Sequence, residues 1–285
     1  MEAKENSLFT DSRGHAITQD DIVKVLEAVG AEKCDTLLIH SELSFGTPNL
    51  NLGRNEILGQ VMGAFQALGV KTLLFPTFTF SFSNYEDYDI MKSRSRMGVL
   101  TEFARKQPLA LRSIDPQMSF AVLGQDVDLV TDIGKECIGA RSTFEKLHNK
   151  ENVRILFFGT SVDACFTYQH YIEYVLHVPY RYNLDFIGTI VDDMGRSHQD
   201  TYTIFVKYRD VIPWTPPTFE KSMIESGAML KASLGDSSLT CFSERDAFSI
   251  TKQWIENDIN AFLAQPYDSM PLVKEYRYGN VTTVQ

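Results

Sequence analysis

Short apolar runs alternate with helix-forming segments along most of this 285-residue chain, and this alternation limits the fold more than any other feature. The first unit reads strand, helix, strand. The segment "CDTLLIHSE" (34–42) has the continuous apolar run of a buried strand, and "KTLLFPTFTF" (71–80) repeats that pattern. Between them, Ile57, Val61 and Phe65 recur at helical spacing before Gly69. Such alternation predicts a layered α/β domain with a central sheet.

The same alternation continues toward the end of the chain. Strands are predicted at "SFAVLG", "VRILFFGT", "FIGTIVDD" and "LTCFSERD", and helices at "GVLTEFARKQ", "TYQHYIEYVLHV" and "RDAFSITKQWIENDINAFL". A further helix is expected before Gly30, because Thr18 and Asp21 form a capping-box pattern. No boundary divides the chain. We therefore predict one domain over residues 17–285 with a partly parallel sheet, preceded by a flexible arm at residues 1–16.

Charge and cysteine content exclude several classes of function. The net charge is -10 and the lysines and arginines form no run, which argues against a nucleic-acid partner. The four cysteines are widely separated, so neither a zinc ribbon nor a redox pair is expected, and we interpret them as reduced thiols. The first residues lack a basic region followed by an apolar run, and no apolar segment reaches the length of a membrane span. The sequence predicts a cytoplasmic protein without a membrane partner.

Common nucleotide and hydrolase motifs are missing from the sequence. It contains no glycine-rich dinucleotide fingerprint, no phosphate-binding loop that ends in Gly-Lys-Ser/Thr, and no nucleophile-elbow serine between spaced glycines. Any phosphate-bearing cofactor must therefore be held in another way.

His170 and Glu173 form the clearest candidate pair, three residues apart in "TYQHYIEYVLHVPYR" (167–181). Residues at this spacing share one face of a helix and can project into one cavity. The spacing alone leaves three interpretations open. The pair is a structural contact, it supplies two metal ligands, or His170 is a proton acceptor that the carboxylate orients. No second helix offers matching ligands, which makes the metal interpretation the weakest.

Other candidate residues lie where the predicted strands end. His40 and Ser41 close the first strand, and loops at such positions in open α/β sheets meet ligands. A histidine that only terminates a strand is an equal alternative. Thr77 and Thr79 share one face of the next strand or its exit, although threonines are also good strand formers.

A polar cluster around Pro116 precedes the strand "SFAVLG" and contains Arg112, Ser113, Asp115 and Ser119. An aspartate that caps its own backbone turn would explain Asp115. Cys165 lies five residues before His170 and is a candidate nucleophile, but a buried, inert thiol is the commoner case.

Taken in order, the segments "LLIHSELSFG", "LLFPTFTF", "MGVLTEFARKQPLALRSIDPQMSFAVLG", "STFEKLHNKENVRILFFGT", "TYQHYIEYVLHVPYR" and "ERDAFSITKQWI" resemble the aminoglycoside 3-N-acetyltransferase family. The family's histidine and glutamate three apart, followed by Pro-Tyr-Arg, match His170, Glu173 and Pro179-Tyr180-Arg181. The resemblance implies a single-domain α/β/α sandwich with a central mixed sheet. It also implies transfer of the acetyl group of acetyl-CoA, the co-substrate, to an amine of a small amino sugar.

By the same matching, three loops would line the coenzyme cleft through His40, Ser41, Ser44, Phe45, Thr77, Thr79, Arg112, Ser113 and Ser119. The sequence departs from the family at two positions. Glu42 stands third in the family's His-Ser-Ser-Leu loop, and Asp115 stands where the family has a histidine before the proline. A carboxylate accepts hydrogen bonds and attracts cations, so Asp115 would add a second acidic group to the catalytic site.

Alternatives to an aminoglycoside substrate follow from these departures. A nucleotide-linked or surface-polysaccharide amino sugar would need Arg141, Arg181 or Arg209 to pair with its phosphates. A coenzyme-binding homologue with impaired catalysis and a cysteine hydrolase built on Cys165 are two further alternatives. The oligomeric state is left undecided, with a homodimer as one alternative.

The resemblance also suggests a mechanism. Only a neutral amine attacks a thioester carbonyl, so a base must accept a proton as the new bond forms. His170 would be that base, and Glu173 would fix its tautomer or anchor the substrate ammonium. Backbone N–H groups or the hydroxyls of Thr77 and Ser119 would stabilise the oxyanion. Direct transfer requires no covalent enzyme intermediate.

Overall fold

The computed structural model describes residues 7–278 and 281–284, and a seven-stranded mixed sheet lies at its centre. The strand order is β12-β13-β9-β3-β5-β8-β7. Three strands are parallel, namely β3 (Thr36–Ser41), β5 (Thr72–Pro76) and β9 (Val153–Phe158). The outer strands run antiparallel to their neighbours and are β7 (Leu111–Arg112), β8 (Phe120–Gly124), β12 (Met229–Leu234) and β13 (Ser237–Ser243).

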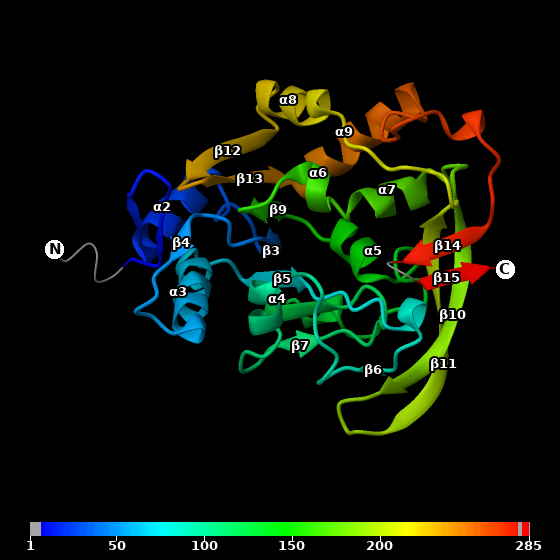
Figure 1. The fold of residues 1–285 in the computed structure, drawn as a ribbon, viewed down its shortest axis with the longest axis horizontal. Coiled ribbons are helices and arrows are strands. Elements are labelled where there is room, and N and C mark those ends of the chain that lie inside the picture. Colours follow the sequence, from blue (N-terminus) through cyan, green and yellow to red (C-terminus); the bar gives the residue numbers. More distant parts are fainter. Residues whose placement is uncertain (1–6, 279–280, 285) are drawn as a thin grey trace.

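Helices cover both faces of this sheet (Figure 1). One face carries α2 (Gln19–Ala28), α3 (Arg54–Ala67) and α4 (Val99–Ala104). The other carries α5 (Thr143–His148), α6 (Val162–Cys165), α7 (Gln169–Val175), α8 (Pro217–Glu225) and α9 (Glu244–Asn257). The side chains of β3 alternate between two buried clusters, with Leu37 and Ile39 in one and Leu38 in the other. These features confirm the predicted α/β/α sandwich.

Local sequence signals explain where several elements begin. At the start of α2, the Thr18 hydroxyl accepts a hydrogen bond from the Asp21 N–H at 3.3 Å, and the Asp21 carboxylate accepts one from the Thr18 N–H at 3.0 Å. This is the expected capping box, and α2 ends before Gly30, whose φ is 70°. Further short helices are η1 (Phe82–Asn84), η2 (Val127–Leu129) and η3 (Tyr267–Ser269).

A long hairpin lies at one end of the molecule and consists of β10 (Arg181–Val191) and β11 (Ser197–Lys207). The short strand β6 (Tyr88–Asp89) pairs with β10, and a second hairpin joins β14 (Glu275–Tyr278) to β15 (Val281–Val284). Figure 1 shows both hairpins beside α7. The segment "FIGTIVDD" falls in the second half of β10 and the turn after it, whereas β11 and β12 were not predicted.

The chain is already packed ahead of the predicted domain start at residue 17. β1 (Phe9–Thr10) pairs with both β2 (Ala16–Ile17) and β4 (Thr47–Pro48), and Leu8 and Phe9 are buried. The part of the predicted flexible arm from Ser7 onward is therefore ordered by strand pairing and apolar burial, and residues 1–6 lie outside the described residues. Within the described ranges, no helix is both long and apolar enough to cross a membrane.

Candidate active site

The carboxyl ends of the parallel strands meet at one edge of the sheet, where open α/β folds bind ligands. The loops after β3 and β9 touch there. The Glu42 N–H donates to the Phe158 carbonyl at 2.9 Å, and the Ser44 hydroxyl donates to the Gly159 carbonyl at 2.6 Å. Gly159 has a φ of 73°, and a Cβ on it would lie 2.1 Å from the Glu42 carbonyl oxygen. Only glycine permits this close approach.

Glu173 is the centre of a polar cluster on α7 directly beyond that edge. Its side chain is 1% exposed. The carboxylate lies 2.7 Å from Arg181 Nε and 3.1 Å from His170 Nδ1. It also accepts hydrogen bonds from the Gln169 amide and the Tyr180 hydroxyl, both at 3.2 Å. The predicted contact between His170 and Glu173 is therefore present, and both carboxylate oxygens have partners.

These contacts set the charge state of the pair. Burial alone would raise the pKa of Glu173, but the Arg181 guanidinium and the hydrogen bond to His170 lower that pKa to about 2. Burial lowers the pKa of His170 below 6.5, and the charge of Arg181 lowers it further, which outweighs the opposite effect of Glu173. At neutral pH the cluster therefore contains a carboxylate beside a neutral imidazole.

The tautomer of His170 depends on two neighbours of the same ring nitrogen. Arg181 Nη2 lies 2.9 Å from Nδ1 and requires an acceptor there, whereas Glu173 requires a donor. If Nδ1 carries the hydrogen and donates to Glu173, Nε2 keeps its lone pair. If Nδ1 accepts from Arg181, Nε2 carries the hydrogen and His170 has no basic nitrogen to offer. Only the first arrangement allows His170 to accept a proton.

His170 lines a pocket of about 220 Å³ between residues 162–169 and residues 213–215. Its side chain is 31% exposed, and Trp214 lies half-exposed on the same pocket. The Trp214 N–H donates to the Phe262 carbonyl at 2.9 Å, which holds this wall to the segment after α9. Asp163 and Thr215 also line a second pocket, of about 520 Å³, so the two cavities adjoin.

Cys165 lines the pocket beside His170, as its place in the sequence suggested. Burial raises the pKa of this thiol to about 11, and its sulfur lies 3.6 Å from the Thr160 hydroxyl. A thiol with a raised pKa is a poor nucleophile, which argues against the cysteine hydrolase alternative.

The predicted coenzyme residues of the first loop divide into two groups. Ser41 and Ser44 line a pocket of about 270 Å³ together with Gly98 and Val99. His40 and Phe45 belong to the interior instead. The His40 ring stacks on Phe157 with ring centroids 5.2 Å apart, and burial lowers its pKa to about 4, while Phe45 is completely buried.

The other predicted coenzyme residues form a buried polar network. The Ser119 hydroxyl donates to the Thr77 carbonyl at 2.7 Å, and the Thr79 hydroxyl donates to the Pro116 carbonyl at 2.8 Å. The Ser113 hydroxyl accepts from the Phe120 N–H at 2.9 Å. The first two bonds join the loop after β5 to the segment before β8, and the third closes the turn between β7 and β8. Of these residues, Thr79 also lines a pocket, of about 480 Å³.

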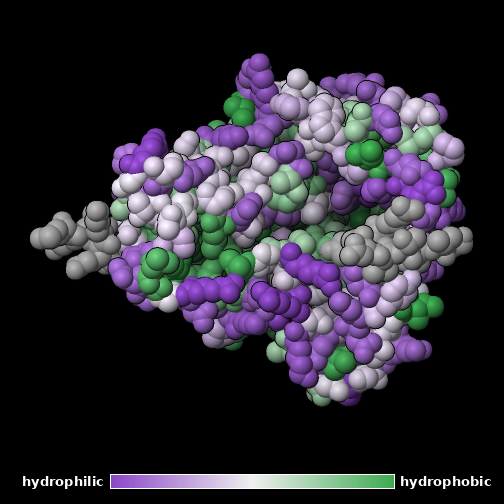
Figure 2. Space-filling model, viewed as in Figure 1, coloured by the Kyte–Doolittle hydropathy of each residue, from purple (hydrophilic) through white to green (hydrophobic). Residues whose placement is uncertain are grey.

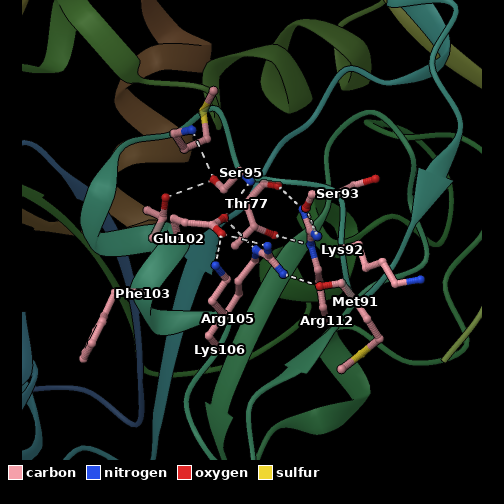
Figure 3. Close-up of polar contacts among 12 residues, drawn as sticks. Thr77, Met91, Lys92, Ser93, Ser95, Glu102, Phe103, Arg105, Lys106 and Arg112 are labelled. Atoms are coloured by element: carbon pink, nitrogen blue, oxygen red, sulfur yellow. Dashed lines mark hydrogen bonds and ion pairs between the residues drawn. The ribbon is translucent and has the colours of Figure 1, made fainter. Parts of the chain in front are cut away.

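Arg112 donates hydrogen bonds mainly to backbone carbonyls, and its Nε also donates to the Thr77 hydroxyl at 3.2 Å. Its guanidinium donates to the Thr77 carbonyl at 2.7 Å, the Ser93 carbonyl at 2.6 Å and the Ile90 carbonyl at 3.2 Å (Figure 3). Arg112 therefore ties the loop at residues 90–93 to the end of β5. The sequence singled out Arg112, and its partners in the structure lie far away in the sequence.

Asp115 caps the turn that contains it. One carboxylate oxygen accepts from the Gln117 N–H at 2.8 Å and from the Met118 N–H at 2.9 Å. The side chain is buried, and burial raises its pKa despite these bonds. This is the backbone-capping arrangement considered from the sequence. No hydrogen bond or ion pair joins Asp115 to His170 or Glu173 in the described part of the chain.

Comparisons with known proteins give a consistent result. The family model for aminoglycoside 3-N-acetyltransferase matches residues 38–256. No curated protein matches the sequence. The solved structure of aminoglycoside acetyltransferase AAC(3)-Xa is similar with a TM-score of 0.71 and 21% identity, over 85% of this chain and 93% of that chain. The structure of AAC-IIIb with CoASH gives 0.70 and 18%, over 87% and 98%. Sisomicin-bound AAC-VIa gives 0.69 and 17%, over 84% and 97%.

Proposed function

The chain belongs to the aminoglycoside 3-N-acetyltransferase family, and we propose that it transfers the acetyl group of acetyl-CoA directly to an amine of an amino sugar, with His170 as the general base. The observation that carries the proposal is the buried, ionised Glu173 in contact with Nδ1 of a neutral His170 whose ring lines a pocket. The similar structure with CoASH supports acetyl-CoA as the donor, and the similar structure with sisomicin supports an amino sugar as the acceptor.

Proton transfer by His170 accompanies the attack of the amine. Nε2 accepts a proton from the amine nitrogen while that nitrogen bonds to the thioester carbon. The imidazolium that forms is stabilised by Glu173 through Nδ1–H. The carbon–sulfur bond then breaks, and the imidazolium returns the proton to the departing thiolate. The hydroxyls of Thr77 and Ser119 are hydrogen-bonded within the fold, which favours backbone N–H groups as donors to the oxyanion.

The acceptor pocket favours a cationic amino sugar. Asp163 lines both adjoining cavities, and its exposed carboxylate can pair with an ammonium group. An indole such as that of Trp214 offers a flat apolar surface and attracts cations over its face.

The arginines considered for a nucleotide-linked sugar already have acidic partners. Arg141 pairs with Asp132 at 2.6 Å, Arg181 with Glu173 at 2.7 Å, and Arg209 with Asp210 at 2.7 Å. A substrate phosphate would have to compete with these carboxylates. These ion pairs therefore favour an aminoglycoside over a nucleotide-linked amino sugar as the acceptor.

The test is a thiol-release assay with acetyl-CoA against a panel of aminoglycosides and amino-sugar nucleotides. His170→Ala should lower kcat at least ~100-fold, because a positioned base contributes about 10²- to 10⁴-fold in rate. Calorimetric affinity for CoA should be unchanged. His198→Ala, a change at an exposed strand position, is the matched control. Turnover by His170→Ala close to that of the unmodified protein would exclude His170 as the base, and CoA binding without acetylation of any amine would favour the catalytically impaired alternative.

A further inference from the structure

Three neighbouring cavities, together called the groove below, lie beside the predicted coenzyme loop. The pocket at residues 41–44 and the pocket at Thr79 share Val99 with a third pocket, of about 520 Å³, that lies between α3 and α4. Arg94 lines the second and third of these cavities, and Arg54 and Lys106 line the third. Figure 2 shows that this face of the molecule is hollowed between α7 and α4. The groove therefore extends from the loop after β3 to a cavity that Arg54, Arg94 and Lys106 share with one carboxylate, that of Glu102.

Three arginines line these cavities. Arg96 pairs with Glu86 at 2.9 Å, whereas Arg54 and Arg94 have different surroundings. Among the side chains that the structure describes, Arg54 and Arg94 have no hydrogen bond or ion pair, and both residues are exposed. Lys106 pairs with Glu102 at 2.7 Å. The chain carries a net charge of -10, so two guanidinium groups that line one cavity without acidic partners are unusual in this protein. Guanidinium groups recognise phosphate by paired, charge-assisted hydrogen bonds.

Hydrogen bonds to residues on both sides of Arg94 fix the loop that carries it (Figure 3). The Ser95 N–H donates to Glu102 at 2.9 Å, and the Arg105 guanidinium donates to the Met91 carbonyl at 2.7 Å. Arg112 holds the Ser93 carbonyl at 2.6 Å. The side chain of Arg105 is 4% exposed. The backbone at Arg94 is thus fixed before any ligand arrives, which reduces the entropy lost on binding.

We propose that Arg54 and Arg94, assisted by Lys106, bind the phosphate groups of acetyl-CoA, with the pantetheine arm in the pocket at residues 41–44. This inference rests on the proposed function, which makes acetyl-CoA the donor. The groove lies near the catalytic pocket, because Glu42 at its near end donates its N–H to the Phe158 carbonyl at 2.9 Å, and the chain after Phe158 leads into α6. Cys165 lines the pocket of His170. An extended thioester in the groove would place its acyl end toward the proposed base.

Kinetics with two donors test the assignment. Acetyl-CoA carries the phosphates, and S-acetylpantetheine carries only the arm. Arg54→Gln and Arg94→Gln should each raise KM for acetyl-CoA about 10-fold, and the double variant more, because a hydrogen bond to a charged group contributes roughly a factor of 10 or more. Neither kcat nor KM for S-acetylpantetheine should change. Arg196→Gln removes an exposed arginine from the β10–β11 turn and is the control.

Direct titration with CoA separates this inference from the proposed function. If CoA binds the unmodified protein and binds the double variant at least 10-fold more weakly, the arginines hold the phosphates, even if no amine is acetylated. If the double variant binds CoA with unchanged affinity, or if KM for S-acetylpantetheine rises as much as KM for acetyl-CoA, the assignment is overturned and the role of His170 stands untouched. Thermal melting of each variant verifies that the fold is intact.

Discussion

Replacing Glu173 with glutamine tests the physical basis of the candidate active site. The substitution keeps the shape of the side chain and removes a charge that is 1% exposed. Arg181, which is 7% exposed, then loses its ionic partner at 2.7 Å. Breaking one side of a buried ion pair costs about 3–5 kcal/mol, because the remaining charge is left without compensation. We expect the free energy of unfolding to fall by that amount.

The expected loss of stability can be measured as a lower melting temperature, and the loss of catalysis as a lower kcat. For a chain of this size, about 2 °C in Tm corresponds to each kcal/mol, so Glu173→Gln should melt roughly 6–10 °C below the unmodified protein. The kcat of the variant should fall by roughly 10²- to 10⁴-fold, since the tautomer of His170 is no longer fixed and the imidazolium is no longer stabilised. Glu151→Gln, a charge removal at an exposed position, should change neither quantity.

A second substitution distinguishes the structural role of Glu173 from its chemical role. In the double variant Glu173→Gln/Arg181→Met no unpaired buried charge remains, so most of the lost stability should return while activity stays low. Equal melting temperatures for Glu173→Gln and the unmodified protein would refute the argument that a buried ion pair supports this site. Full activity in the stable double variant would refute the role given to Glu173 in catalysis.

Two further predictions concern pH and Asp115. Burial lowers the pKa of His170, so kcat/KM should rise with pH through a midpoint below 6.5. With respect to this group, kcat/KM should then level off toward neutral pH. A pH–rate profile with a midpoint above 6.5 would contradict the assignment of His170 as the base. Asp115→Asn keeps the oxygen that accepts from Gln117 and Met118 and should preserve kcat and Tm, whereas Asp115→Ala should lose about 1–3 kcal/mol of stability in denaturant titrations. A kcat loss above ~100-fold in Asp115→Asn would instead give the carboxylate a chemical role.

The sequence predicts the sandwich well because its signals are local. Apolar runs locate β3, β5 and β9, and helical spacing locates α3 and α7. The contact between His170 and Glu173 follows from the same local geometry, since residues three apart on a helix are neighbours. The strand β12 was missed because its burial shows no regular alternation, whereas β11 was missed although Tyr202, Ile204 and Val206 alternate with period two.

Long-range partners are what the sequence could not provide. Arg112 binds carbonyls more than fifteen residues away in the chain, which no local pattern could predict, and its place at the coenzyme stays a prediction. The role of Arg181 was signalled only by the Pro-Tyr-Arg that follows the helix, and the exposed Arg54 and Arg94 gave no signal, because neither belongs to a motif. The cytoplasmic location, the single domain and the homodimer stay predictions.

The central sheet separates two buried cores, and the proposed donor and acceptor regions lie on opposite sides of it. Arg54 lies on α3, beside the core of α2, α3 and α4, whereas His170 lies on α7, beside the core of α5, α7 and α9. If the acceptor binds at Trp214 and Asp163 as proposed, substitutions there would alter acceptor choice without disturbing the packing on the side of α3. A protein partitioned in this way can change the molecules it modifies over evolutionary time while it keeps one acetyl donor.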